Sequence, residues 1–234
     1  MFRALLFREV RLLVASSWMP ATLMFVFYGG FAAVLLLAGD ALGPGLIPNG
    51  VDLFTIFCAV SLGASPLFLF MTAPTTMVEK SLGIAENLLA YLRSPRWLIL
   101  GKALFLGGVA YSFFLFWSAV GWVLGLFASA RFVGSGLFAR DVVLALLFYP
   151  LVLFFFTLVQ VFFIYLFPQL AQLVNVLLFA ATFGIFSHIT EIAGSLTKAN
   201  VLAVGAAVAL LGCLNGLLVA FVRGLPCEPV VRSR

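Results

Sequence analysis

Six charged side chains gather between positions 79 and 102 of a chain that otherwise avoids charge. The 234 residues include only 13 Lys and Arg and 8 Asp and Glu, and six of these lie in one stretch: Glu79, Lys80, Glu86, Arg93, Arg96 and Lys102. Such groups form ion pairs and charge-assisted hydrogen bonds, but they are costly beside a bilayer unless a partner or water receives them. We therefore expect this segment to lie at a membrane surface and to contact something there.

A helical period runs through residues 79–93. One stripe is apolar (Leu82, Ala85, Leu88, Leu89 and Leu92), and a second is charged, with Glu79, Glu86 and Arg93 spaced by seven. An amphipathic helix can rest in the membrane interface or dock into a groove of a soluble partner. Two acids beside anionic headgroups are unfavourable, which favours docking. A solvated loop helix without a partner is the alternative.

The composition excludes a soluble fold. The chain is 65% hydrophobic with 27 Phe, against roughly 45–50% apolar residues in soluble domains. Spanning needs about 20 apolar residues, and six stretches reach that length: 19–39, 53–78, 99–128, 142–167, 169–190 and 200–222. The first is too long for a cleaved signal peptide and lacks a small-residue cleavage site. We expect an all-α integral membrane protein with six transmembrane helices in a single domain, 1–234.

The distribution of basic residues predicts the orientation. With the N-terminus inside, the inner segments carry ten Lys and Arg and the outer segments three, namely Arg131, Arg140 and Lys198. Both termini and the segment 79–98 are therefore expected to be cytoplasmic. We expect residues 1–18 to form an amphipathic helix in the membrane interface. The alternative is a basic flank that only sets the topology. Residues 223–234 form the cytoplasmic tail.

Proline and polar residues predict irregularities within the spans. Pro66, Pro74 and Pro150 should kink their helices, and Pro168 should make a very short turn between antiparallel helices. Gly, Ser and charged residues near 185–200 predict a broken or re-entrant piece.

Four residues within the spans are candidates for a substrate path: Phe155, Gln160, Asn175 and Asn215. Aromatic and uncharged polar side chains can line a path, but lipid contact and structural hydrogen bonds are the alternatives. No charged residue lies convincingly in the middle of a span, which weakens a proton- or ion-coupled mechanism and favours an amphipathic substrate. The three cysteines and one histidine have no metal-ligand spacing, so we expect no metal site.

The charged segment resembles the membrane subunits of ABC-2 type exporters. After their second span these proteins carry an acidic residue, a Gly, a second Glu before a Leu pair, a Pro-containing turn and a Gly-Lys that enters the third span. The corresponding residues here are Glu79, Gly83, Glu86, Leu88-Leu89, Ser94-Pro95 and Gly101-Lys102. One departure is Leu92, where the family commonly has Pro, and Pro95 takes over the turn.

The resemblance implies a non-catalytic permease subunit driven by a separate cytoplasmic ATPase. The chain contains no phosphate-binding Gly-rich loop ending in Lys-Ser or Lys-Thr, so ATP and Mg would be bound by the partner. A coupling helix would contact that ATPase through Glu79, Lys80, Gly83, Glu86, Leu88, Leu89 and Arg93. The family also implies a second permease copy or paralogue, surrounding lipid, no nucleic acid, export, and a bacterial or archaeal cytoplasmic membrane.

Two other classes of function stay open. An autonomous secondary transporter or channel is disfavoured by the missing charge within the spans. A membrane-embedded enzyme is disfavoured because the sequence has no clustered His/Asp/Glu set, and Asp141, His188 and Glu191 are expected to be dispersed at the outer face.

Overall fold

The described part of the chain is a helical bundle. The structure is a computed structural model that describes residues 53–84, 87–88, 95–127 and 139–225, together with the single positions Phe7, Arg11, Thr22 and Val26. The predicted interfacial helix 1–18, the first span 19–39 and the tail beyond residue 225 lie outside the described ranges. Every regular element in these ranges is a helix, which confirms the all-α class.

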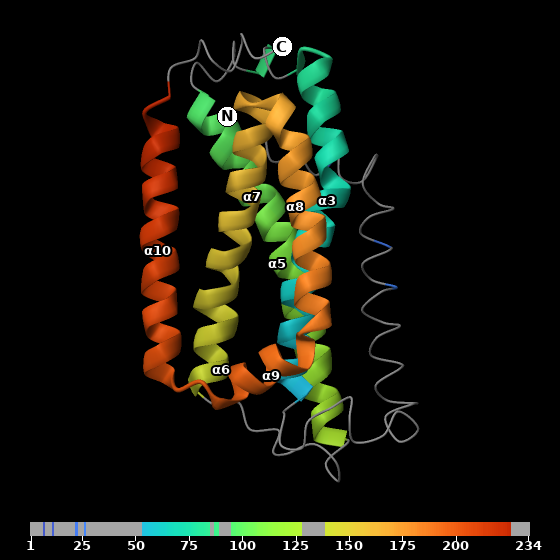
Figure 1. Ribbon diagram of the computed structural model, residues 1–234, viewed down its shortest axis with the longest axis vertical. Coiled ribbons are helices and arrows are strands. Elements are labelled where there is room, and N and C mark those ends of the chain that lie inside the picture. The colour runs from blue at the N-terminus through green and yellow to red at the C-terminus, as the bar shows by residue number, and fades with distance from the viewer. Residues whose placement is uncertain are drawn as a thin grey trace.

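Among the described residues, five helices are long and apolar enough to cross a membrane. Figure 1 shows the long helices running roughly parallel. The order is α3 (Leu53–Ser81), α5 (Pro95–Phe127), α6 (Ala139–Val143), the π-helix η1 (Leu144–Phe148), α7 (Tyr149–Leu166), α8 (Pro168–Ser187), α9 (Ile189–Lys198) and α10 (Val201–Arg223). α6, η1 and α7 together form one crossing, Arg140–Leu166. Their bounds agree to within about one helical turn with five of the six predicted spans.

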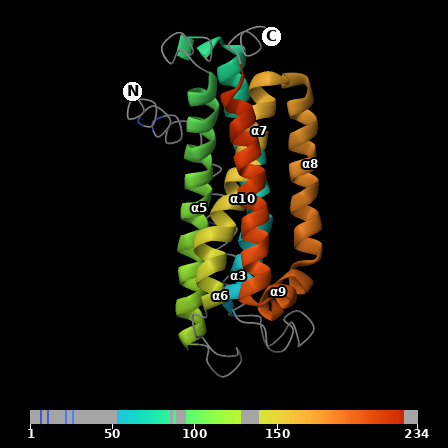
Figure 2. The same cartoon turned by 90° about the vertical axis from the view of Figure 1, so that its left-hand side faces the viewer.

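α3 is the central helix, and α10 stands at the edge. α3 contacts α5, α7, α8 and α9, whereas α10 packs on α7 and more weakly on α5 and α6. Seen from its side, α10 lies in front of α7 (Figure 2). One core cluster lies where α3 meets α5, α7 and α8, and small residues such as Ala59 and Ala64 let these backbones approach.

Pro150 produces a local change of helix type. A proline has no backbone N–H, so the ordinary i−4 hydrogen bond at that position cannot form. The five residues Leu144–Phe148, which end two positions before Pro150, are π-helical, and the N–H of Tyr149 donates to the carbonyl of Leu144. A π-turn of this kind is a common way to accommodate such a defect. Pro66 and Pro74, by contrast, remain inside the single helix α3.

The connection between α7 and α8 is as short as Pro168 predicts. Phe167 alone leaves the helical conformation, with φ −134° and ψ 66°, and Pro168 begins α8. Pro suits the first position of a helix because its missing N–H would have no partner there. The two helices form an antiparallel hairpin at one end of the bundle (Figure 1).

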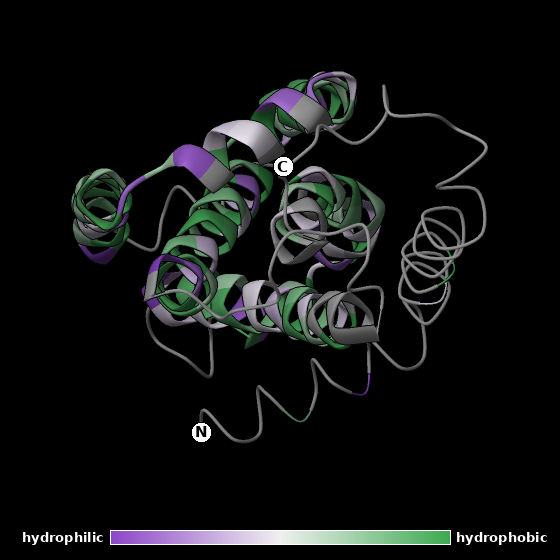
Figure 3. Ribbon diagram, turned by 90° about the horizontal axis from the view of Figure 1, so that it is seen from below, coloured by the Kyte–Doolittle hydropathy of each residue, from purple (hydrophilic) through white to green (hydrophobic). Residues whose placement is uncertain are grey.

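The chain is broken near 185–200, as predicted. α8 ends at Ser187, His188 adopts φ −111° and ψ 19°, and the short helix α9 then crosses the end of the bundle to α10. Seen from below, the long helices are mostly hydrophobic, and α9 carries hydrophilic residues between them (Figure 3). Asn200 starts α10 by accepting a 2.7 Å hydrogen bond from the N–H of Ala203.

Two neighbouring glycines allow a direct test of the contact between α5 and α7. A Cβ at Gly107 would lie 3.2 Å from Thr157 Oγ1 and 3.8 Å from the Cα of Phe154, whereas one at Gly108 meets nothing within 4 Å. We expect Gly107→Leu to lower the free energy of unfolding by about 1–3 kcal/mol through overpacking. Gly108→Leu should be neutral or stabilising by up to about 1 kcal/mol. Denaturant titration in detergent micelles measures both, and equal effects of the two substitutions would refute the packing described.

Candidate functional site

Two of the predicted site residues, Glu79 and Lys80, lie in the last turn of α3, and both are buried. Glu79 Oε2 forms an ion pair with Lys102 Nζ on α5, and both side chains are buried. The pair joins the two ends of the charged segment, although 23 positions separate them in the sequence. Because a buried charge is costly unless it is paired, this contact holds the start of α5 beside the end of α3.

Lys80 makes the corresponding contact to α7. Its Nζ donates a 2.8 Å hydrogen bond to the carbonyl oxygen of Tyr165. Tyr165 is the last residue but one of α7, so its carbonyl is among those that lack a partner within the helix. A cation at this position also offsets the negative end of the helix dipole. We call this end of the bundle, with Glu79, Lys80, Lys102 and the α7–α8 turn, the coupling end.

The structure corrects the prediction of one continuous helix over 79–93. α3 ends at Ser81, and Gly83 has φ 70°, a left-handed conformation that favours glycine. Its N–H donates to the carbonyl of Lys80, and helical spacing resumes when Asn87 donates to the carbonyl of Gly83. Glu79 and Leu88 therefore belong to different helical pieces, one on each side of Gly83.

Leu88 ties the segment beyond Gly83 back to the bundle. It is half-buried and packs against a cluster that includes Leu98 and Ile99 of α5, Leu166 of α7 and Val222 of α10. The other predicted coupling residues, Glu86, Leu89 and Arg93, lie outside the described residues. Apolar packing and the two lysine contacts thus fix the base of this segment to several helices.

The three polar candidates for a substrate path all bind neighbouring helices. Gln160 Nε2 donates to the carbonyl of Leu69 on α3 at 2.6 Å and to Asn175 Oδ1 on α8 at 3.2 Å. Asn215 Nδ2 donates to the carbonyl of Leu151 on α7 at 3.0 Å. All three side chains are buried, so the structure favours the alternative of structural hydrogen bonds.

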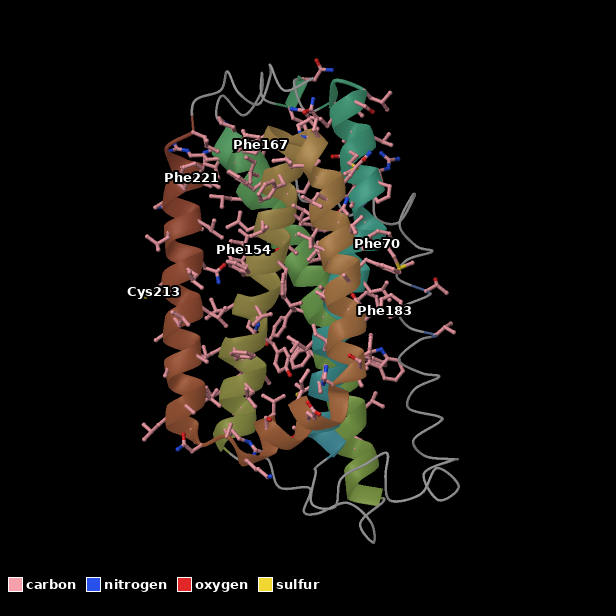
Figure 4. The ribbon with its side chains drawn as sticks, in the orientation of Figure 1. Phe70, Phe154, Phe167, Phe183, Cys213 and Phe221 are labelled. Atoms are coloured by element: carbon pink, nitrogen blue, oxygen red, sulfur yellow. The ribbon has the colours of Figure 1, made fainter. Side chains whose placement is uncertain are left out.

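The aromatic candidate for the substrate path, Phe155, lies in an edge contact with a neighbouring ring. Phe155 is half-buried, and its ring centroid lies 6.0 Å from that of Phe156 in a T-shaped arrangement. Near the coupling end, Phe162 lies 6.2 Å from Phe167 and 5.7 Å from Phe221. Figure 4 shows Phe167 and Phe221 at this same end, contributed by the α7–α8 turn and α10. Aromatic packing therefore joins α10 to α7 here.

A cavity of about 560 Å³ opens at the coupling end. Its lining combines one ammonium group with mostly apolar side chains: Met77, Lys80, Ser81, Leu82, Gly83, Ile164 and Pro168. Sequence analysis missed it because it forms only where the end of α3 meets the α7–α8 hairpin. The sequence signals were Lys80 and the helix-breaking Gly83 and Pro168, which lie far apart along the chain.

A second group of charged residues lies at the opposite end of the bundle. Arg140 Nε donates to the buried carboxylate of Asp141 at 2.8 Å, and the exposed His188 Nδ1 lies 3.0 Å from Glu191 Oε2. Among the described residues, no three His, Cys, Asp or Glu side chains are grouped closely enough to hold a metal ion.

The buried ion pair can be tested with a double-substitution cycle. We expect Lys102→Met to lower the free energy of unfolding by about 3–5 kcal/mol, because it removes the charge that faces Glu79. Glu79→Gln combined with Lys102→Met should recover most of that loss. Lys198→Met, an exposed lysine of α9, is the control and should change stability by less than about 0.5 kcal/mol. A loss at Lys102 no larger than at Lys198 would contradict the buried pair.

Gln160→Leu tests the hydrogen bonds within the bundle. The substitution removes the two hydrogen bonds that Gln160 Nε2 donates to the Leu69 carbonyl and to Asn175 Oδ1. We expect the free energy of unfolding to fall by about 0.6–1.7 kcal/mol. Gln172→Leu, on the exposed face of α8, is the matched control and should have little effect. Equal results for the two variants in detergent micelles would show that the Gln160 contacts contribute nothing.

Comparison of the chain with protein-family models, with curated proteins and with solved structures finds no match. A function for the coupling end must therefore be argued from the spacing of its residues and their contacts.

Proposed function

We propose that this chain is the membrane-spanning permease subunit of an ATP-binding-cassette exporter, driven by ATP that a separate subunit hydrolyses. The observation that carries the proposal is the buried ion pair between Glu79 and Lys102. These residues are the first and last charged positions of the motif that resembles ABC-2 permeases. Their contact closes the segment between them into a loop whose base is fixed to α3 and α5.

A partner that moves this loop would move the helices beneath it. Lys80 links the base to α7 through Tyr165, and Leu88 packs against side chains of α5, α7 and α10. When the ATPase closes and displaces this loop, the helices attached to its base would therefore move together as a rigid body. Rigid-body rotation is one of the usual ways in which conformational change is transmitted. The ATPase would hold ATP and Mg, and this chain would contribute no catalytic residue.

The described helices support a substrate that needs no fixed charge in the middle of the membrane. The charged residues of the five long helices lie near the helix ends: Glu79, Lys80, Arg96, Lys102, Arg140, Asp141 and Arg223. Ion-coupled carriers usually place an ionisable group at depth. We therefore favour an amphipathic, lipid-linked or hydrophobic substrate, exported across a bacterial or archaeal cytoplasmic membrane.

A second permease copy or paralogue would complete the pathway. Only 17% of the apolar window of α8 and 11% of that of α10 is buried within the chain, so lipid or another subunit must cover them. On α10, Gly212 and Gly216 form a Gly-x-x-x-Gly pair, and a Cβ at either would meet nothing within 4 Å. Such pairs allow close approach of a second helix. Cys213 points away from the bundle on the same helix (Figure 4).

Charge reversal in the loop tests the proposal. The protein is purified from its native membranes in mild detergent, the accompanying P-loop ATPase is identified and quantified, and ATP hydrolysis is measured in liposomes. We expect Glu86→Lys to lower the retained ATPase by about tenfold or more, because close charge pairs across interfaces contribute about 1.5 kcal/mol or more. Glu191→Lys, which reverses an exposed acid at the opposite end, should leave it unchanged.

Two results would overturn the proposal. One is purification of the folded protein without any P-loop ATPase, with flux driven by a proton gradient alone. The other is equal ATPase retention and stimulation by the Glu86→Lys, Glu191→Lys and unmodified proteins.

A further inference from the structure

Pro150 deprives one carbonyl of its regular backbone donor. In an α-helix the carbonyl of Ala145 would accept from the N–H of Tyr149, but Tyr149 donates to Leu144 instead. In a π-helix the donor would be residue 150, and this residue is a proline without an N–H. Because a carbonyl without a partner is costly inside a membrane, another group must serve Ala145.

The hydroxyl of Tyr111, on the neighbouring helix α5, supplies this hydrogen bond. Tyr111 Oη donates to the carbonyl oxygen of Ala145 at 2.9 Å. The two residues are 34 positions apart, so the bond joins two crossings rather than two turns of one helix. Stacked rings adjoin it, since the ring centroid of Phe114 lies 5.9 Å from that of Tyr111 and 4.2 Å from that of Tyr149. Side chains of α5 therefore supply what the backbone of the next crossing lacks.

The π-turn divides this crossing into two parts that have different neighbours. On one side, α7 packs on α3, α5, α8 and α10. On the other side, α6 and η1 pack chiefly on α10, and we call these residues, 139–148, the far segment. Figure 2 shows α6 next to α10 at the end of the bundle opposite the coupling end. Prolines and π-turns are where helices bend, and π-turns are frequent at functional sites.

We infer that Leu144–Phe148 is a hinge, and that the Tyr111 hydroxyl is the latch that holds the far segment closed against α5. When the latch breaks, the Ala145 carbonyl accepts a hydrogen bond from water, and the far segment swings with the start of α10, on which it packs. One neutral hydrogen bond shifts such an equilibrium by only about two- to tenfold, so the latch opens reversibly. In a transporter the far segment would gate the end of the passage remote from the ATPase, but the inference rests only on the contacts among α5, η1 and α10.

Two adjacent hydroxyls of α5 give a matched test. Tyr111→Phe removes the donor to Ala145 and keeps the ring. Ser112→Ala removes a hydroxyl that also donates at 2.9 Å, but to the carbonyl of Gly108 within α5 itself. The full chain is placed in nanodiscs, and mass spectrometry follows hydrogen–deuterium exchange in peptides from the far segment and from α7. We expect Tyr111→Phe to speed exchange of the far segment by about two- to tenfold and to leave α7 unchanged. Ser112→Ala should exchange like the unmodified protein.

Pro150→Ala distinguishes a latch from an ordinary packing contact. The substitution restores an N–H at the position from which a π-helical carbonyl of Ala145 accepts. The far segment should then exchange more slowly than in the unmodified protein. Adding Tyr111→Phe to Pro150→Ala should have little further effect, because the Ala145 carbonyl keeps a backbone donor. The two substitutions are therefore expected to be non-additive, as is usual for groups that share a partner.

Three results would overturn the inference. Equal exchange by Tyr111→Phe and Ser112→Ala would show that the Tyr111 hydroxyl holds nothing in place. An equal effect of Tyr111→Phe with and without Pro150→Ala would show that it does not act through the carbonyl that Pro150 leaves. Faster exchange to the same extent in the far segment and in α7 would show that the crossing has no hinge. If Pro150→Ala does not fold, the first and third comparisons decide the question. Because no measurement involves ATP hydrolysis, failure here would leave the proposed transport function untouched.

Discussion

The buried ion pair between Glu79 and Lys102 is the constraint on which the rest of this structure depends. Apolar packing between helices is nearly as favourable in one axial register as in another, because lipid chains are as apolar as the residues they replace. A buried carboxylate and a buried ammonium group, in contrast, must form a pair, because burying either charge alone in surroundings of low dielectric constant costs several kcal/mol. One pair near the ends of two long helices, α3 and α5, therefore fixes their relative height.

The same principle applies to the contacts of α7 with α3, α8 and α10, where a small number of polar contacts lie within an apolar interface. α7 is linked to α3 through Lys80 and through Gln160, and to α8 through Asn175. α10 is linked to α7 through Asn215. These contacts lie at two levels, the coupling end and the middle of the bundle. They therefore define both the relative height of the helices and the rotation of each helix about its axis. They explain why polar residues occur at depth in a chain that is 65% hydrophobic.

The sequence predicted what depends on local chemistry and missed what depends on partners distant along the chain. Helix bounds, the Pro168 turn and the break near His188 follow from apolar length and from residues that cannot continue a helix. Glu79 was placed on a docking face because periodicity cannot distinguish a charge that faces a partner from one that faces Lys102. Gly83 was the available local signal, since glycine after a charged helix end commonly stops the helix in a left-handed conformation. The cavity could not be predicted from any one segment, because its walls come from the end of α3 and from the α7–α8 hairpin.

The burial of Glu79 and Lys80 changes which residues a partner could touch. Both charges are used within the bundle, so contact at the coupling end must come from side chains that remain exposed there. The described residues offer Leu82, 67% exposed, and Trp97, 52% exposed, with the Arg96 guanidinium 5.7 Å from the Trp97 ring centroid. Trp and Arg are enriched among the side chains that anchor interfaces, and the exposed Leu82 would add apolar area beside them. Glu79 and Lys102 would then transmit force from such a contact rather than make it. Under the proposed function, this division of roles would account for charge being placed where it is costly, since a buried pair would help to hold α3 and α5 together while the loop between them is displaced.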